Sequence, residues 1–292
     1  MLEKKFGPLD AAICKSEGRK FTMLSVYDYP TARLAAASNI ETLLVGDSLA
    51  MTVLGHTDTV SVTTDEMLHH VKAVSRGAGN SMVVADMPFL SYQTSLRDAV
   101  MNAGRFMKEG RADVVKIECG QNSEKTISAI HNAGIPVIAH IGLTPQSAGQ
   151  LGGLKVQGKS VDAALRMIDD ARSYEEAGAF AVLMECVPAE IARLVSESLK
   201  VPTISYGAGP NCDCQGLVSA DVLGIFDRGV VAFNSIIEPS KPSNSILFLI
   251  ACIGTCIFFI LKNLPYISLS PTQFNSSSSV SNIYLISWMG IG

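Results

Sequence analysis

Residues 82–118, MVVADMPFLSYQTSLRDAVMNAGRFMKEGRADVVKIE, hold two short apolar runs on either side of a longer stretch of helical character. The two runs, Met82–Ala85 and Val114–Ile117, have the length and β-rich composition of buried strands. Leu96–Glu109 between them is predicted to be a helix, and Gly110 follows it at a position typical of a C-cap. A strand, a helix and a second strand in this order predict a βα unit of a parallel sheet.

The same alternation runs through the first three quarters of the chain. Further strands are expected at Thr22–Val26, Thr42–Val45, Val137–Ala139, Ala181–Met184, Thr203–Ser205 and Gly216–Ser219. Further helices include Asp65–Arg76, Ser123–Asn132, Ala163–Glu176 and Ala189–Leu199, and Gly77, Gly134 and Gly178 are expected C-caps. Eight strands with intervening helices favour an α/β fold of the TIM (β/α)8 barrel type over an open sheet. The first strand–helix turn has no GxGxxG, which counts against a Rossmann domain.

The composition excludes several classes of protein. The 292 residues carry a net charge of −4, so no basic surface is expected for nucleic acid or anionic lipid. The first twenty residues contain neither an apolar core nor an Arg-rich amphipathic pattern of a targeting peptide. The seven cysteines are scattered without paired CxxC spacing, which argues against a zinc site and indicates reduced thiols. These features predict a cytoplasmic protein.

Functional side chains stand at the end of nearly every expected strand. They are Asp47, Ser48, Asp86, Lys116, Glu118, His140 and Glu185. The carboxyl ends of barrel strands share one mouth, where active sites lie. Asp47, Asp86 and Glu118 come from three successive strands, and converging carboxylates repel each other unless a cation neutralises them. Oxygen ligands of this kind suit Mg²⁺.

Two further residues fit acid–base chemistry at this mouth. Lys116 and Glu118 are two positions apart and point to the same face, so the lysine can contact an anionic substrate. Glu185 lies in an apolar run, where partial burial would raise its pKa and suit a general base. Taken singly, each residue also has a structural interpretation, such as a helix cap for Asp47 or Asp86, a surface position for Glu118, or a structural histidine for His140.

Eight segments carry a resemblance to a known family. They are SVYDYPTA (25–32), LLVGDSLAMTVLGH (43–56), TTDEMLHHVKAVSRGA (63–78), VVADMPFLSY (83–92), VVKIECG (114–120), HIGLTPQSAGQLGGLKVQGK (140–159), EEAGAFAVLMECVPAE (175–190) and GAGPNCDCQGLV (207–218). With these segments in this order, residues 5–226 resemble ketopantoate hydroxymethyltransferases. The resemblance implies a TIM barrel that transfers a hydroxymethyl group from 5,10-methylenetetrahydrofolate to 3-methyl-2-oxobutanoate through a Mg²⁺-stabilised enolate, giving 2-dehydropantoate for pantothenate biosynthesis.

The resemblance also implies roles for individual residues. Asp47, Asp86 and Glu118 match the Mg²⁺ positions of the family, and Glu185 matches its proton acceptor. The substrate-binding positions match Asp47, Ser48, Asp86 and Lys116, and His140 matches an active-site histidine near the substrate. The family acts on small molecules and assembles into homo-oligomers, often decamers.

Two parts of the chain depart from the family pattern. Ser205 and Tyr206 stand where small residues such as Gly and Ile are expected, and Tyr206 is expected to narrow the mouth. The barrel domain is predicted to span 1–226, and residues 227–292 form an atypical tail in place of the last helix region. Residues 246–261 are almost wholly apolar, and no charged residue follows Lys262. The tail is interpreted as a non-native extension, with a membrane segment at 245–261 as the alternative.

Three functions remain open at this point. The first is the hydroxymethyltransferase. The second is another Mg²⁺-dependent enzyme of 2-oxo acid enolates, of the phosphoenolpyruvate mutase or isocitrate lyase type. The third is a catalytically impaired barrel, because of the altered C-terminus.

Overall fold

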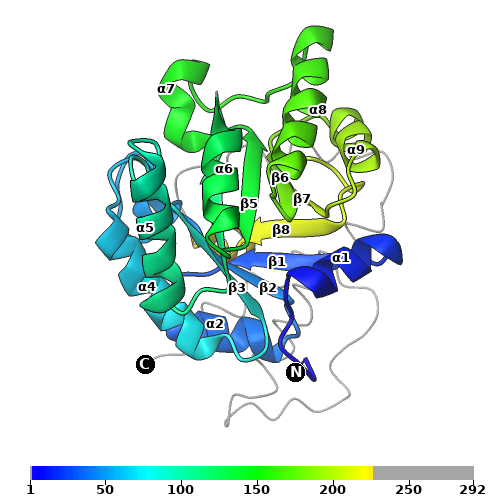
Figure 1. The fold of residues 1–292 in the computed structure, drawn as a ribbon. Coiled ribbons are helices and arrows are strands. Elements are labelled where there is room, and N and C mark those ends of the chain that lie inside the picture. Colours follow the sequence, from blue (N-terminus) through cyan, green and yellow to red (C-terminus); the bar gives the residue numbers. More distant parts are fainter. Residues whose placement is uncertain (1, 121, 226–292) are drawn as a thin grey trace.

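A computed structural model describes residues 2–120 and 122–225, in which eight parallel strands close into a barrel in chain order (Figure 1). The strands are β1 (Phe21–Ser25), β2 (Thr42–Val45), β3 (Met82–Asp86), β4 (Val114–Glu118), β5 (Val137–Gly142), β6 (Ala181–Glu185), β7 (Thr203–Tyr206) and β8 (Cys214–Val218). The pairing of β8 with β1 completes the ring. The predicted TIM (β/α)8 barrel is therefore confirmed. Every expected strand is present, with ends within two residues of the prediction except for β5, which continues three residues beyond Ala139.

Helices surround this barrel (Figure 1). The longer ones are α2 (Tyr29–Ala37), α4 (Thr64–Gly77), α5 (Leu96–Lys108), α6 (Ser123–Asn132), α8 (Val161–Glu176) and α9 (Ala189–Ser198). Short helices follow β2, β5 and β8, namely α3 (Leu49–Thr52), η1 (Pro145–Ser147), α7 (Ala148–Leu151) and α10 (Ser219–Leu223). Within the described chain, residues 207–213 join β7 to β8 without a helix, so the helical ring is open on that side.

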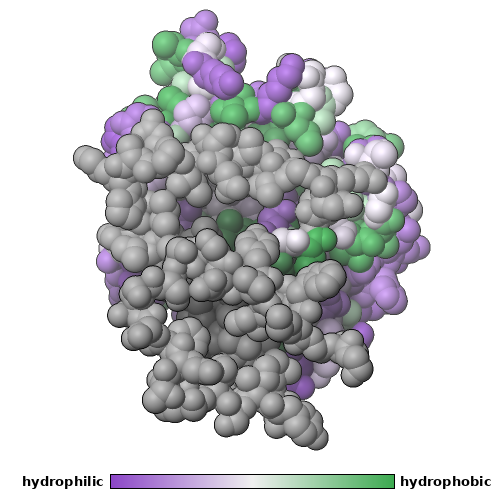
Figure 2. All heavy atoms as spheres, turned by 180° about the vertical axis from the view of Figure 1, so that it is seen from behind, coloured by the Kyte–Doolittle hydropathy of each residue, from purple (hydrophilic) through white to green (hydrophobic). Residues whose placement is uncertain are grey.

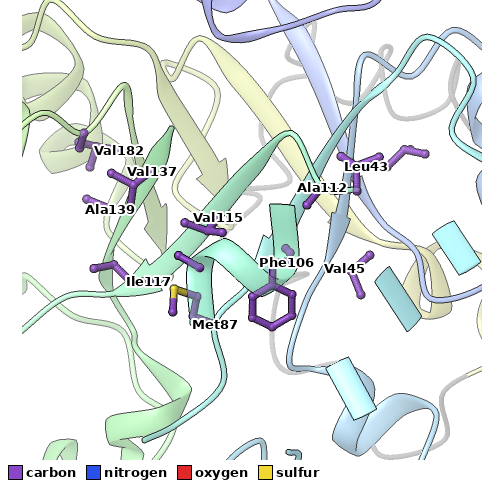
Figure 3. Packing of buried hydrophobic residues seen from close by; sticks show 14 of the residues in the cluster. Leu43, Val45, Met87, Phe106, Ala112, Val115, Ile117, Val137, Ala139 and Val182 are labelled. Carbon is purple, nitrogen blue, oxygen red and sulfur yellow. The ribbon is translucent and has the colours of Figure 1, made fainter. Parts of the chain in front are cut away.

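Alternate residues of each strand serve two separate cores. Leu43 and Val45 of β2 and Val115 of β4 face outward and pack beneath the helices, where Figure 3 shows them around Phe106 of α5. Leu44 and Val114 face inward and belong to the barrel interior. This period of two places every second side chain of a strand inside the barrel. The inward positions at the carboxyl ends of the strands are occupied by Asp86, Lys116, Glu118, His140 and Glu185.

The amino-terminal end of the barrel is closed by α1 (Pro8–Ser16), which the sequence analysis did not anticipate. Ala11 and Cys14 of this helix, with Phe6 before it, pack against Phe21 in the interior cluster. Pro8 begins the helix at a position where its missing N–H costs nothing. A cavity inside the barrel can therefore open only at the carboxyl ends of the strands.

The glycines expected as helix C-caps fall into two groups. Gly134 and Gly178 follow α6 and α8 with φ of 82° and 105°, as a left-handed cap requires. The prediction was wrong for Gly77 and Gly110, which permit close packing instead. A Cβ on Gly77 would lie 2.6 Å from the carbonyl oxygen of Tyr29, so glycine lets α4 approach α2.

Exposed apolar and polar side chains are interspersed over the described part of the face in Figure 2. Among residues 2–120 and 122–225 no helix is long and apolar enough to cross a membrane. The atypical tail, 227–292, and the possible membrane segment at 245–261 lie outside the described residues. The described residues contain free thiols, as predicted, at Cys14, Cys119, Cys186, Cys212 and Cys214.

Candidate active site

A cavity of about 130 Å³ opens at the carboxyl ends of the strands. All seven residues singled out from the sequence line it: Asp47, Ser48, Asp86, Lys116, Glu118, His140 and Glu185. Leu44, Leu143, Leu183 and Val218 supply an apolar part of its wall. A cavity of about 150 Å³ can hold a benzene-sized molecule. The volume therefore suits a small acid, and a pterin would have to bind nearer the opening.

Asp47 and Asp86 lie side by side at the ends of β2 and β3. The backbone N–H of Asp47 donates to Oδ2 of Asp86 at 3.0 Å. A Cβ on Gly46 would lie 3.3 Å from the same oxygen, so glycine at this position keeps space for the Asp86 carboxylate. Burial, and next the negative charge of Asp86, raises the pKa of Asp47 to about 7.

Neither aspartate is a helix cap. The N-cap of α3 is Ser48, and its side chain makes no capping hydrogen bond. The Ser48 hydroxyl instead lies 2.8 Å from the hydroxyl of Tyr27. Asp86 ends its strand nine residues before Ser95, which caps α5. The structural interpretation as caps is therefore wrong for both residues.

Lys116 provides the positive charge of the cavity. Its Nζ lies 2.8 Å from Oδ1 of Asp86 in a buried ion pair, and 3.1 Å from Nδ1 of His140. Burial disfavours the ammonium form, but the charges of Asp86, Asp47 and Glu118 outweigh that effect and raise the pKa of Lys116. Lys116 therefore stays charged and offsets one carboxylate.

His140 lies between Lys116 and Glu185. Burial, and next the charge of Lys116, lowers the pKa of His140 well below its ordinary value, so the ring is neutral. Its Nε2 lies 3.4 Å from Oε2 of Glu185, and its Nδ1 lies 4.0 Å from Oε1 of Glu118. With a neutral ring these two contacts are not ion pairs.

Glu185 ends β6 with its side chain 21% exposed to solvent. Burial raises its pKa to about 8, and the more distant Lys116 opposes this shift. The backbone around Glu185 depends on Gly142, which has φ of 89° and on which a Cβ would lie 2.4 Å from the carbonyl oxygen of Glu185. The next residue, Cys186, has φ of 49°, an unusual value for a non-glycine residue and one often found beside functional groups.

Glu118 is buried rather than on the surface. Its Oε2 accepts a hydrogen bond from the backbone N–H of Gln146 at 2.9 Å. Its Oε1 is buried and makes no hydrogen bond with any residue of the described chain. Burial, and next the charge of Asp47, raises the pKa of Glu118 well above its ordinary value.

The sequence analysis missed Asp221, which lines the cavity, and also Gln146 and Tyr92, which lie behind the lining residues. The Gln146 side chain donates to Oδ2 of Asp47 at 2.8 Å, and the Tyr92 hydroxyl donates to Oε1 of Gln146 at 2.9 Å. Both residues stand inside segments quoted for their family resemblance, HIGLTPQS and VVADMPFLSY. Membership of those segments was the available signal, because neither residue ends a strand.

The carboxylates fit a cation, although the described residues contain no group of three or more His, Cys, Asp or Glu that converges on one metal position. Five carboxyl groups, those of Asp47, Asp86, Glu118, Glu185 and Asp221, line the cavity together with the single ammonium of Lys116. Burial raises the pKa of Asp47, Asp86, Glu118 and Glu185, and the opposing charge of Lys116 does not cancel this effect. Carboxylate oxygens, one of them buried without a partner, suit Mg²⁺, which takes one or two carboxylates and keeps several waters.

Tyr206 lies inside the barrel and also lines the cavity. A Cβ on Gly216 of the neighbouring strand would lie 2.1 Å from its ring, so the glycine makes room for the aromatic side chain. The Tyr206 hydroxyl lies 3.1 Å from that of Ser25. The departure from small residues at this position is therefore accommodated by β8 and β1.

Comparisons with known proteins agree on one family. The family model described as Ketopantoate hydroxymethyltransferase matches residues 9–238. A 3-methyl-2-oxobutanoate hydroxymethyltransferase of Heliobacterium modesticaldum is 55% identical over 219 residues, which are 75% of this chain and 79% of the relative. The enzyme of the same name from Clostridium botulinum is 52% identical over 231 residues, covering 78% and 84% of the two chains.

Solved structures of other enzymes share the fold. Phosphonopyruvate hydrolase superposes with a TM-score of 0.59 at 14% identity, over 88% of this chain and 98% of that one. A 2,3-dimethylmalate lyase of the PEP mutase/isocitrate lyase superfamily superposes with a TM-score of 0.58 at 16% identity, over 88% and 98%. At such low identity these likenesses show the barrel fold alone.

Proposed function

This chain belongs to the ketopantoate hydroxymethyltransferase family, and we propose that it transfers a hydroxymethyl group from 5,10-methylenetetrahydrofolate to 3-methyl-2-oxobutanoate, giving 2-dehydropantoate for pantothenate biosynthesis. The observation that carries the proposal is a small cavity with two chemically different sides. Asp47, Asp86 and Lys116 form one side, and Glu185 stands on another with a raised pKa.

The acidic side suits the 2-oxo acid head of the substrate. Lys116 can pair with the substrate carboxylate, and the hydroxyl of Ser48 lies beside the same part of the cavity. The apolar wall, which includes Leu143 and Leu183, suits the branched hydrocarbon end. In this orientation the substrate is anchored by its polar head, and its C3 carbon is left near the remaining side of the cavity.

Asp47, Asp86 and Glu118 would hold Mg²⁺, with water and the 2-oxo acid completing its oxygen ligands. When bound, the ion supplies Lewis-acid polarisation of the 2-oxo group. The fit rests on the buried and unbonded Oε1 of Glu118 and on the shortage of positive charge around the three carboxylates.

Glu185 would remove the proton from C3. Burial makes its carboxylate a stronger base than an exposed glutamate, and its partial exposure leaves it accessible from the cavity. His140 beside it is neutral, with Nε2 3.4 Å from the carboxylate, and Lys116 would stabilise negative charge that develops on the oxo oxygen. The carbon freed of its proton then bonds to the methylene carbon of the folate. The two bonds from that carbon to the folate nitrogens break, a water supplies the hydroxyl group, and the nitrogens take up the C3 proton and the remaining proton of the water.

The experiment is C3–H exchange of 3-methyl-2-oxobutanoate in deuterated water with Mg²⁺, followed by NMR. We expect the Glu185→Gln variant to lose exchange by at least ~100-fold while it still binds the 2-oxo acid. The control is Glu190→Gln, the same substitution at an exposed site on α9. Undiminished exchange in Glu185→Gln, with the control equally active, would rule out Glu185 as the base.

A lyase or mutase of the phosphoenolpyruvate mutase or isocitrate lyase type is the competing assignment. Sequence identity to such enzymes is 14–16%, whereas identity to the hydroxymethyltransferases is 52–56%. The transferase is therefore favoured. Product formation that needs 5,10-methylenetetrahydrofolate separates the two, because a carbon–carbon lyase needs no folate. Full activity of the complete chain also tests whether the altered C-terminus leaves the barrel catalytically impaired.

We also propose that the enzyme acts in the cytoplasm and forms a homo-oligomer. The small anionic substrates and the reduced cysteines support the first proposal, and the family resemblance supports the second. Sedimentation of the complete chain tests the assembly, and a monomer at micromolar concentration would contradict it.

A further inference from the structure

We propose that Gln146 is a positioning residue that holds Asp47 and Glu118 for cation binding, an inference that rests on the function proposed above. Gln146 belongs to the short helix η1 after β5, and 99 residues separate it from Asp47 along the chain. It is buried over the carboxyl ends of the strands. From this position it contacts both carboxylates, which stand two strands apart in the barrel.

Every hydrogen-bonding group of the Gln146 side chain has a partner. The amide nitrogen donates to Oδ2 of Asp47 at 2.8 Å and to the carbonyl oxygen of Met87 at 3.0 Å. The amide oxygen accepts from the Tyr92 hydroxyl at 2.9 Å and from the side chain of Gln93 at 3.2 Å. A glutamine amide has two donors and one oxygen with two lone pairs, so this side chain is fully satisfied.

These partners determine which way the amide points. If oxygen and nitrogen were exchanged, the amide oxygen would face the Asp47 carboxylate and the Met87 carbonyl, which are both acceptors. Tyr92 is compatible with this orientation. Its hydroxyl can donate to the Gln146 oxygen at 2.9 Å, which is nearer than its other acceptor, the carbonyl oxygen of Glu118 at 3.1 Å, and it accepts from the backbone N–H of Glu118. The amide therefore donates to Asp47 in one fixed direction.

The backbone of Gln146 acts on the second carboxylate. Its N–H donates to Oε2 of Glu118 at 2.9 Å, while Oε1 of the same carboxylate stays buried and without a hydrogen bond in the described chain. A further partner at this oxygen would offset the cost of its burial. One residue thus fixes Asp47 through its side chain and fixes Glu118 through its backbone, with one oxygen of Glu118 left for a ligand.

A neutral residue is the suitable choice for this position. A lysine or arginine would hold the two carboxylates and also neutralise them, which would compete with a cation. The glutamine amide orients the charge without reducing it, as residues that hydrogen-bond to metal-binding carboxylates do.

The test compares Gln146→Met with the unaltered protein. Methionine keeps the length of the side chain and the backbone N–H, and removes the amide that orients Asp47. We expect the dissociation constant for Mn²⁺ alone, measured by electron paramagnetic resonance, to rise about 10- to 100-fold. The control is Gln93→Met, which loses the contact between the two glutamines and a contact with the backbone N–H of Tyr92, and which should change the dissociation constant far less. The metal-free melting temperature should fall more in Gln146→Met, because its side chain makes four hydrogen bonds.

A second variant separates positioning from simple packing. Tyr92→Phe keeps the ring and removes the hydroxyl that orients Gln146, so we expect a smaller weakening of Mn²⁺ binding. The double variant should weaken Mn²⁺ binding by less than the two single effects combined, because the Tyr92 hydroxyl acts partly through this amide and partly through the backbone N–H of Glu118. Unchanged Mn²⁺ affinity in Gln146→Met and in Tyr92→Phe would overturn the inference. Absence of Mn²⁺ binding and of C3–H exchange in the unaltered protein would instead overturn the proposed function itself, and this inference with it.

Discussion

His140 accepts a hydrogen bond at Nδ1 from the ammonium of Lys116, over 3.1 Å. An ammonium group can only donate, so a neutral imidazole in this contact must carry its proton on Nε2. That atom is the one that lies 3.4 Å from Oε2 of Glu185. The charge of Lys116 thus places the hydrogen of His140 on Nε2, the atom beside Glu185, with which it makes no hydrogen bond in the described chain.

The tautomer is measurable. We expect ¹⁵N NMR of histidine-labelled protein to show His140 as a neutral ring protonated at Nε2 throughout pH 5.5–8, because burial and Lys116 lower its pKa. The His140→Asn variant assigns the resonance. A shift of that resonance to the imidazolium form near pH 6 would contradict the assignment and would make the contact with Glu185 an ion pair.

A second prediction concerns Glu185 and pH. Burial raises its pKa to about 8, so the folded state retains a proton that the unfolded chain releases near its ordinary value. Between those two values the folded state binds more protons, and the free energy of unfolding of the metal-free protein must fall as pH rises. Glu185→Gln removes this dependence. The measurement is the free energy of unfolding in urea at pH 5 and at pH 8.5. We expect the difference between the variant and the unaltered protein to shift by about 1–3 kcal/mol in favour of the variant from the lower pH to the higher.

The same shift predicts the pH dependence of proton exchange in the metal-free protein. Only the deprotonated form of Glu185 accepts a proton, so the rate of C3–H exchange should rise about tenfold per pH unit up to the pKa. A rate independent of pH between 6 and 8 would show that Glu185 is already ionised in that range.

A third prediction concerns the buried ion pair of Lys116 and Asp86. Lys116→Met leaves the carboxylates around it without their positive partner, and removal of one partner of a buried pair costs about 3–5 kcal/mol. We expect urea unfolding at pH 8 to show a loss of this size, and a smaller loss at pH 5.5, where Asp86 can take up a proton. The control is Lys72→Met, which breaks an exposed pair with Glu109 and should cost less than about 1 kcal/mol.

The sequence predicted those functional residues that lie on strands, because the alternation of side chains along a strand determines which way each one points. Lys116 and Glu118 are two residues apart on one strand, so their shared inward direction follows from the pleat. Gln146 could not be placed in this way, because it follows β5 in a short 3-10 helix and contacts Asp47, 99 residues earlier in the chain. Such a contact depends on closure of the barrel, which no local pattern encodes.

The helix α1 was not predicted, for a related reason. Its nine residues are followed closely by β1, and Leu9 on its outer face is 81% exposed, so its pattern does not indicate a buried face. Its role in closing the barrel becomes evident only from the packing of Cys14 among interior residues of several strands.

The last prediction concerns Tyr206 and Gly216, whose complementary sizes fill the barrel interior between β7 and β8. A Cβ on Gly216 would lie 2.1 Å from the Tyr206 ring, a buried ring whose hydroxyl contacts Ser25. We expect Gly216→Ala to destabilise the protein by about 1–3 kcal/mol in urea unfolding, because overpacking must displace the ring. Gly104→Ala on α5 is the control, since its Cβ would meet nothing within 4 Å and alanine favours a helix.

A second substitution shows whether the ring is the cause. In a Tyr206→Ile background the smaller side chain leaves space beside β8, so Gly216→Ala should cost close to nothing there. The difference between the two costs is the coupling free energy of the pair, which we expect to be about 1–3 kcal/mol. If Gly216→Ala were equally destabilising in both backgrounds, the cost would come from the backbone of β8, and the two residues would not be a matched pair.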